Sequence, residues 1–202
     1  MSALRSGRQL VAAVRALLLA TVVLGLVYPL VVWGFAQLVA PARADGSLVS
    51  VDGGIVGSSL IGQAFVDADG DPLPEYFQSR PSASDYDGAA SGGSNLGPNS
   101  SDLVDAITER QSQVAAFNGV TPADVPADAV TASASGLDPG ISPAYAAIQV
   151  ARVAAARGAS EADIEGLVTE ATHGRDLGFI GAAYVNVLEL NLALDERYGT
   201  AG

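Results

Sequence analysis

The 202-residue chain contains no cysteine and no lysine, and its only histidine is His173. The absence of cysteine excludes a disulfide framework, a thiolate nucleophile and a cysteine-based metal site. The absence of lysine excludes a Walker phosphate loop, in which a glycine run ends in Gly-Lys-Ser/Thr. A single histidine cannot supply the paired imidazole ligands of a typical zinc site. We therefore expect no bound metal and no catalytic residue in this chain.

Acidic residues are missing from the first part of the chain. Residues 1–43 carry four arginines, Arg5 among them, and no Asp or Glu, whereas all 22 acidic residues and the other six arginines follow Arg43. The formal charge is thus +4 before this boundary and −16 after it. A nucleic-acid interface needs clustered basic side chains, so the acidic part is not expected to bind nucleic acid.

Residues 16–42 form a run without any charged side chain. A helix needs roughly 20 apolar residues to cross a bilayer, so this run predicts one transmembrane helix over residues 16–39. Pro29 lies inside the run and is expected to kink the helix. Trp33 is expected near the outer interface of the membrane.

Two interpretations fit this N-terminal run. Residues 42–44 (ARA) resemble a signal-peptidase site, but an apolar signal region usually has 7 to 15 residues, so its length favours an uncleaved anchor. Segments rich in Arg and Lys beside a membrane helix favour the cytoplasmic side, and here three arginines precede the run while acidic sequence follows it. We therefore expect a cytoplasmic tail over 1–15, a linker over 40–47 and an extracytoplasmic domain over 48–202, in a single-pass protein of the cell membrane.

The sequence of the soluble part, residues 48–202, predicts an α+β fold in a single compact domain. Short apolar runs at 48–51, 55–56 and 60–65 indicate strands or turns. Helical spacing of apolar residues predicts a helix over 102–117, capped by Ser101 or Asp102. Residues 142–158, 160–173 and 186–198 begin with capping signals and predict three further helices. A short strand is expected at 185–187, and the alternating LELNLAL at 188–194 also fits a strand.

No motif in the chain assembles convincing chemistry. His173 is expected at a helix end, where the helix dipole favours a cation, rather than as a base or ligand. Residues 92–97 (GGSNLG) could hold an anion on backbone N–H groups, but a structured glycine turn is the favoured interpretation. The DADGD run at 67–71 begins like a calcium loop, yet Gln78 stands where the bidentate Glu belongs.

Several segments, taken in order after one N-terminal span, resemble one family, the C subunit of the bacterial Kdp-type potassium-transporting P-type ATPase. The resemblance covers nearly the whole chain. The segments that carry it are 76–82 (YFQSRPS), 91–98 (SGGSNLGP), 130–139 (VTASASGLDP), 147–153 (AIQVARV) and 185–195 (VNVLELNLALD).

The resemblance implies an accessory, non-catalytic subunit that stabilises a high-affinity potassium-uptake complex. Its implied partners are a channel-like potassium-binding subunit, the P-type ATPase subunit and a small F peptide. The family has also been described as a catalytic chaperone that raises the ATP affinity of the ATPase subunit. No tightly bound cofactor is implied, only transient ATP shared with that subunit.

The same resemblance suggests particular residues. Gln149, with Ser133, Ser135 and Gly136, would contact nucleotide, although an extracytoplasmic domain meets no ATP, and a bracing role for Gln149 is the favoured interpretation. Fold or interface roles are expected for five further residues, namely Arg80, Asn95, Arg152, Asn186 and Asn191. The alternatives to a pump subunit are a membrane-anchored extracytoplasmic enzyme that uses Ser and His173, and an envelope-binding domain.

Overall fold

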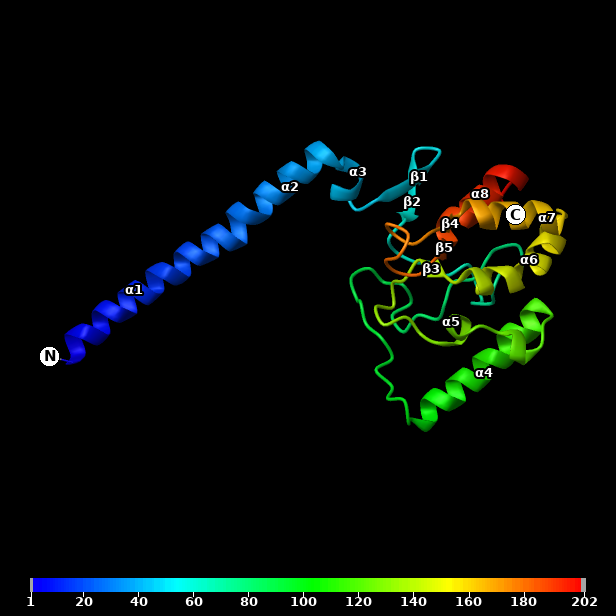
Figure 1. The fold of residues 1–202 in the computed structure, drawn as a ribbon, viewed down its shortest axis with the longest axis horizontal. Coiled ribbons are helices and arrows are strands. Elements are labelled where there is room, and N and C mark those ends of the chain that lie inside the picture. The colour runs from blue at the N-terminus through cyan, green and yellow to red at the C-terminus, as the bar shows by residue number, and fades with distance from the viewer. Residues whose placement is uncertain (1, 201–202) are drawn as a thin grey trace. The chain divides into compact units, whose positions relative to one another are not determined.

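The computed structural model describes residues 2–200, with side chains from residue 7 onward, so the side chain of Arg5 lies outside the described part. The chain separates into two compact units that divide between Leu48 and Val49. Figure 1 shows the elements of both units in chain order. We describe each unit by itself.

The N-terminal unit is almost entirely helical. It contains α1 (Ser2–Val22), a π-helical turn η1 (Val23–Val27), α2 (Tyr28–Val39) and the short α3 (Pro41–Ala44). By length and composition, Gly7–Val39 can cross a membrane. The helix begins well before residue 16, so most of the expected tail is helical as well.

Pro29 acts on this helix through the π-helical turn. The backbone N–H of Tyr28 donates to the Val23 carbonyl, five residues earlier, instead of the usual four. A proline ring clashes with the carbonyl four residues before it, here Gly25, and supplies no N–H of its own. The widened turn directly before Pro29 accommodates that ring without ending the helix.

The soluble unit opens with a β-hairpin of β1 (Leu48–Val51) and β2 (Gly54–Ser58). Its two turn residues, Asp52 and Gly53, both have positive φ, 51° and 82°. This is the type I′ geometry that suits the twist of paired strands, and Asp-Gly is a favoured sequence for it. The dipeptide was thus a hairpin signal that our sequence analysis did not use.

Helices and a small sheet build the rest of the unit. The helices are α4 (Ser101–Asn118), η2 (Pro122–Asp124), α5 (Ala127–Val130), α6 (Pro143–Arg157), α7 (Glu161–Glu170) and α8 (Val187–Tyr198). The strands β3 (Gly140–Ile141), β4 (Thr172–His173) and β5 (Tyr184–Asn186) form an antiparallel sheet in the order β3–β5–β4. Val185 pairs with both Ile141 and Thr172. The α+β class is confirmed.

Helix starts were predicted well at α6, α7 and α8. The side chains of Ser142, Ser160 and Asn186 each accept the backbone N–H three residues later, as capping residues do. At α4 the prediction of a Ser101 or Asp102 cap was wrong: the N-cap position is Ser100, whose side chain makes no capping bond.

The structure decides between two pairs of alternatives and corrects one helix end. The predicted helix over 186–198 is confirmed as α8, and the alternative strand at 188–194 is excluded, because Val187, Leu190, Asn191 and Leu194 share the buried face of α8 at helical spacing. Of the strand or turn expected at 60–65, the structure has a turn at residue 60 followed by irregular chain. The helix α7 ends at Glu170, because the next residues pair with β5.

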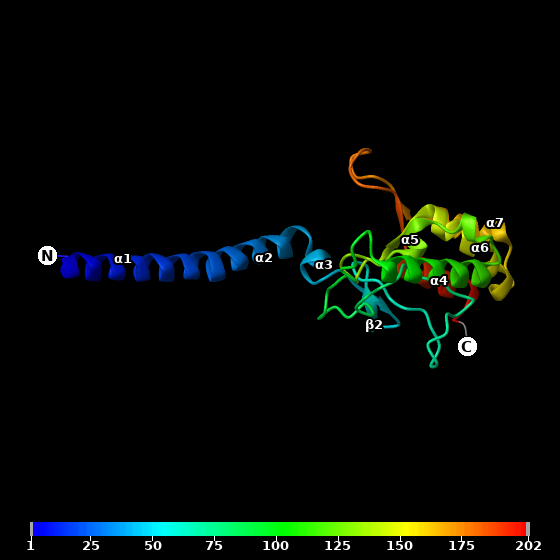
Figure 2. The same cartoon turned by 90° about the horizontal axis from the view of Figure 1, so that it is seen from below.

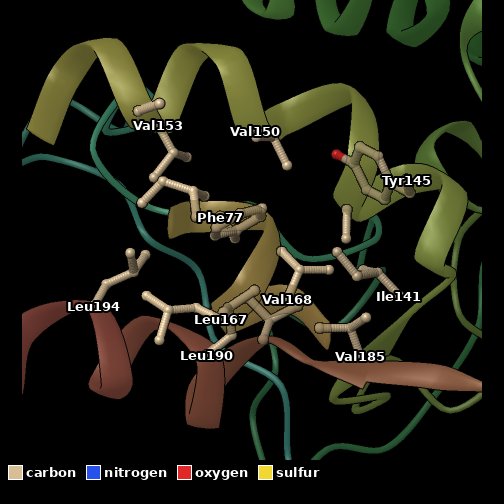
Figure 3. Close-up of a cluster of buried hydrophobic side chains, with 14 of the residues drawn as sticks. Phe77, Ile141, Tyr145, Val150, Val153, Leu167, Val168, Val185, Leu190 and Leu194 are labelled. Atoms are coloured by element: carbon tan, nitrogen blue, oxygen red, sulfur yellow. The ribbon is translucent and has the colours of Figure 1, made fainter. Parts of the chain in front are cut away.

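The core of the soluble unit surrounds Phe77. This side chain is fully buried, although its own segment is irregular. Figure 3 shows it between Val150 and Val153 of α6 on one side and Leu190 and Leu194 of α8 on the other. The Phe77 ring therefore packs at the centre of the core between two helices.

Replacing Phe77 by alanine should strongly destabilise the fold. The cavity and the lost burial together are expected to cost about 3–5 kcal/mol. Denaturant unfolding of the purified full-length chain in detergent, followed by circular dichroism, measures this change. The matched control is Phe179→Ala, because that ring is 72% exposed and its loss should change stability by less than about 0.5 kcal/mol. Equal losses in the two variants would contradict the assignment of the core.

Candidate functional site

The segment around Phe77 crosses the domain with its backbone buried between two helices. Asn191 of α8 forms two hydrogen bonds with one residue of this segment: its Oδ1 accepts from Phe77 N at 2.9 Å, and its Nδ2 donates to Phe77 O at 2.9 Å. Asn191 is only 1% exposed. Its carboxamide therefore bonds to both backbone polar groups of Phe77.

Gln149 of α6 does the same for the next residue. Its Oε1 accepts from Gln78 N at 2.7 Å, and its Nε2 donates to Gln78 O at 3.1 Å. Gln149 has no exposed surface. We call Asn191 and Gln149, with the backbone of residues 77 and 78, the amide clamp.

The amide clamp satisfies four backbone groups that no strand satisfies. A carboxamide presents an acceptor and a donor side by side, as one residue of a neighbouring strand does. Successive residues of an extended chain direct their polar groups to opposite sides, so one helix serves Phe77 and the other serves Gln78. Since an unpaired buried backbone group costs as much as a lost hydrogen bond, the clamp is needed for burial of this segment.

Arg152 extends the clamp toward α4. Its guanidinium donates to Gln149 Oε1 at 2.8 Å, to Asn118 Oδ1 at 2.9 Å, and to the carbonyls of Pro74 and Tyr76. It also lies over the Phe117 ring, 4.3 Å from the centroid. Burial lowers the pKa of Arg152 to about 10, which keeps the group charged at neutral pH.

A second arginine ties the same segment to the end of the chain. Arg157 donates to the Glu75 and Gly199 carbonyls and to Asp195 Oδ1, the last at 2.8 Å. The Tyr76 hydroxyl donates to the other oxygen of Asp195 at 3.1 Å. Burial, with the neighbouring Asp195, raises the pKa of Tyr76. Arg157 was not among the residues predicted from the sequence, and only its place at the end of an expected helix could have suggested it.

Arg80, the next predicted site residue, lies beyond the clamp. It bonds to Asp138 Oδ2 at 2.9 Å and to the Thr131 carbonyl at 3.3 Å, while its Nε is buried without a partner. With Ser133, Ser135 and Asp138 it lines a surface hollow of about 650 Å³. Arg80 therefore connects the motif segment to the loop at 132–139.

The predicted nucleotide contacts Ser133, Ser135 and Gly136 form one tight turn. Ser133 is buried, and its Oγ accepts from Gly136 N at 3.0 Å and from Ser135 N at 3.2 Å. Gly136 has a φ of 70°, and a Cβ there would collide with Ser84 Oγ. Ser135 is exposed, and its Oγ accepts from Leu137 N. Bonds within the turn, with those from Ser82 and Gly92 to its carbonyls, thus fix its shape, and of the three predicted contacts only Ser135 is exposed.

Gln149 does not join these residues in one pocket. It bonds to Gln78, whereas the turn is attached to the same segment three residues later, through Ser133 N and the Pro81 carbonyl at 2.9 Å. The hollow beside the turn is lined by Arg80 and Asp138, not by Gln149. Because the amide of Gln149 is fully buried, this geometry favours a bracing role.

The remaining predicted residues differ in setting. Asn186 is buried, caps α8 through Glu189 N and donates to the Ser59 carbonyl at 2.8 Å, so it links the helix to the region after β2. Asn95 is exposed with a φ of 54°. Among the described residues, no hydrogen-bond partner is recorded for its side chain, so Asn95 provides a left-handed backbone position.

His173 is not at a helix end, and the expected helix-dipole contact was wrong. Because residues 172–173 pair with β5, the ring stacks on Tyr184 with centroids 4.8 Å apart. Its Nε2 lies 3.0 Å from Glu189 Oε2. Within residues 2–200, no three His, Asp or Glu side chains are placed to hold a metal ion. Of the predicted residues, the structure brings Gln149, Arg152 and Asn191 together around one buried segment.

Replacing Asn191 by leucine should destabilise the fold although the two side chains have the same number and branching of heavy atoms. The variant leaves the buried N–H and C=O of Phe77 without partners, at about 1–3 kcal/mol for each group. Denaturant unfolding of the full-length chain measures the loss. Gln113→Leu is the control, because Gln113 is exposed and bonds only to Glu109 on the surface of α4. An Asn191→Leu variant as stable as this control would show that the clamp is dispensable.

Comparison with known proteins gives one family. A family model described as "KdpC: K+-transporting ATPase, c chain" matches residues 10–196. A "Potassium-transporting ATPase KdpC subunit" of Kineococcus radiotolerans is 59% identical over 180 residues, covering 88% of each chain. A subunit with the same description from Beijerinckia indica is 53% identical, and the match covers 90% of each chain. Another from Gemmatimonas aurantiaca is 52% identical, and the match covers 88% of this chain and 87% of the relative. The chain therefore belongs to the KdpC family, the c chains of K+-transporting ATPases.

Proposed function

We propose that this chain is an accessory, non-catalytic subunit that stabilises a high-affinity, ATP-driven potassium-uptake complex. Its partners are the channel-like potassium-binding subunit, the P-type ATPase subunit and a small F peptide. The relatives' descriptions as subunits of a potassium-transporting ATPase support this proposal. The structural observation that supports this role is the amide clamp.

The clamp supports an accessory role because residues from the segments that resemble the family make their contacts inside the domain. Asn191, Gln149 and Arg152 hold a buried segment in place. A domain braced in this way keeps one shape before and after docking, which reduces the conformational entropy lost on association. A rigid docking body is what a stabilising subunit requires.

The proposed placement in the membrane follows the charges. The uncharged stretch 16–39 within the helical Gly7–Val39 would anchor the chain, with residues 1–15 in the cytoplasm and the acidic unit outside. In that orientation the soluble unit meets the extracytoplasmic faces of its partners. The finer role of raising ATP affinity, with nucleotide contacts from Gln149 and the turn at Ser133–Gly136, requires the opposite placement, because ATP is cytoplasmic.

Affinity purification tests the accessory role. A tagged full-length chain, recovered in mild detergent from its own membranes after growth at limiting potassium, should retain the channel-like and ATPase subunits in constant proportion. Quantitative mass spectrometry measures that proportion. Recovery of neither subunit would contradict the proposal and favour an anchored enzyme or envelope-binding domain.

Cysteine labelling tests the orientation and, with it, the ATP role. Since the natural chain has no cysteine, Ser135→Cys introduces a single, exposed thiol. A membrane-impermeant maleimide should label it in intact cells stripped of any outer layer. Gln9→Cys, exposed on α1, is the control and should react only after lysis. Protection of the thiol of the Ser135→Cys variant until lysis would place the turn in the cytoplasm, where ATP contact becomes the leading account.

A further inference from the structure

The loop between β4 and β5 has an unusually apolar tip. Leu177 is 82% exposed, Phe179 is 72% exposed and Ile180 is 49% exposed. Figure 2 shows this segment, coloured orange, projecting away from the rest of the domain. We call residues 174–183 the apolar loop. Clustered exposed apolar side chains of this kind mark interaction sites more often than single ones do.

The apolar loop has a defined shape. Asp176 N donates to the Ile180 carbonyl at 3.0 Å, and Ile180 N donates to the Asp176 carbonyl at 2.9 Å. Gly178 and Gly181 have positive φ of 83° and 79°, and Leu177 also has a positive φ, 52°. Leucine rarely adopts this strained conformation. The paired hydrogen bonds therefore hold the backbone of the tip in a defined turn.

The root of the apolar loop is attached to the domain. His173, directly before it, stacks on Tyr184, directly after it. His173 also bonds to Glu189 of α8 at 3.0 Å. The stack brings the two ends of the loop together, and the bond to α8 links them to the helix that carries Asn191. The apolar loop is thus held by the same framework as the clamp.

The apolar loop differs in charge from the surface around it. Six arginines follow Arg43 in this acidic part of the chain. Among described residues, five have partners within the fold, namely Arg80, Arg110, Arg152, Arg157 and Arg197. The side chain of Arg175, at the start of the loop, makes no ion pair or hydrogen bond with these described residues. With Asp176 beside it, the loop is neutral on a domain whose excess of acidic residues repels other acidic surfaces.

We propose that the apolar loop docks into an apolar pocket on another protein subunit of the same membrane complex. This inference rests on the proposed function and names the surface through which the subunit engages a partner. Leu177 and Phe179 are the anchoring side chains, and Arg175 pairs with an acidic group at the pocket rim. A strained, hydrogen-bonded tip suits a pocket of fixed shape, because preorganisation lowers the entropy cost of binding. Insertion into fluid lipid needs apolar area but no fixed shape.

Site-specific photo-crosslinking identifies what the loop touches. A benzophenone amino acid replaces Phe179 in the full-length chain, which is irradiated in native membranes and analysed by mass spectrometry. A product with another pump subunit is expected. A lipid adduct, a product between two copies of this chain, or no product would overturn the inference. Co-purification of the pump subunits with the unsubstituted chain tests the proposed function separately, so the two failures are distinguishable.

Paired variants measure the contribution of the loop. Leu177→Ser combined with Phe179→Ser should lower co-purification of the partner subunits about tenfold, as loss of a buried anchor does. Val104→Ser on α4, where Val104 is 57% exposed, is the matched control and should leave recovery unchanged. Unfolding curves of all variants should coincide, because these side chains lie outside the core. Recovery that stays at the level of the control would overturn the inference.

Gly178→Val tests the importance of shape. The variant keeps every apolar side chain of the tip but strains a backbone position with a φ of 83°, where a β-branched residue is especially disfavoured. Docking into a protein pocket predicts a clear loss of partner recovery, of about tenfold. Recovery equal to that of the unsubstituted chain would show that the loop acts through apolar area alone and would overturn docking into a shaped pocket.

Discussion

The soluble unit depends on two carboxamides that replace the neighbours of a strand. Asn191 and Gln149 satisfy both backbone polar groups of Phe77 and Gln78 from opposite sides. This permits an irregular segment to cross the interior, where unpaired N–H and C=O groups would be too costly. The Phe77 ring then fills the core between α6 and α8. One arrangement therefore supplies hydrogen bonding and hydrophobic packing at the same point.

Two arginines near the clamp connect it to other parts of the unit. Arg152 connects the clamp to the end of α4, and Arg157 connects the same segment to Asp195 and the last described residues. Both guanidiniums bond to backbone carbonyls as well as side-chain oxygens, and both lie over aromatic rings. Such contacts need the planar, multiply donating group of arginine. The result is a domain with a fixed shape, as a stabilising subunit needs.

Interior bracing and exposed recognition occupy different residues in this chain. The segments by which the sequence resembled its family contribute Asn191, Gln149 and Arg152 to the interior. The apolar loop lies just outside them, and its side chains are among the most exposed of the soluble unit. Its root is nevertheless attached to α8 through His173 and Glu189. A rigid interior can therefore hold a protruding contact surface in one position.

The sequence by itself determined the apolar N-terminal helix, the family and the starts of α6, α7 and α8, because long apolar runs, specific motifs and capping residues act locally. It also indicated that Gln149 and Asn191 matter, but not how. Only the tertiary structure decided that they bond to residues 71 and 114 positions away, that LELNLAL is a helix, and that His173 belongs to a strand. These outcomes depend on which distant backbone groups need partners once buried, and no local pattern encodes that pairing.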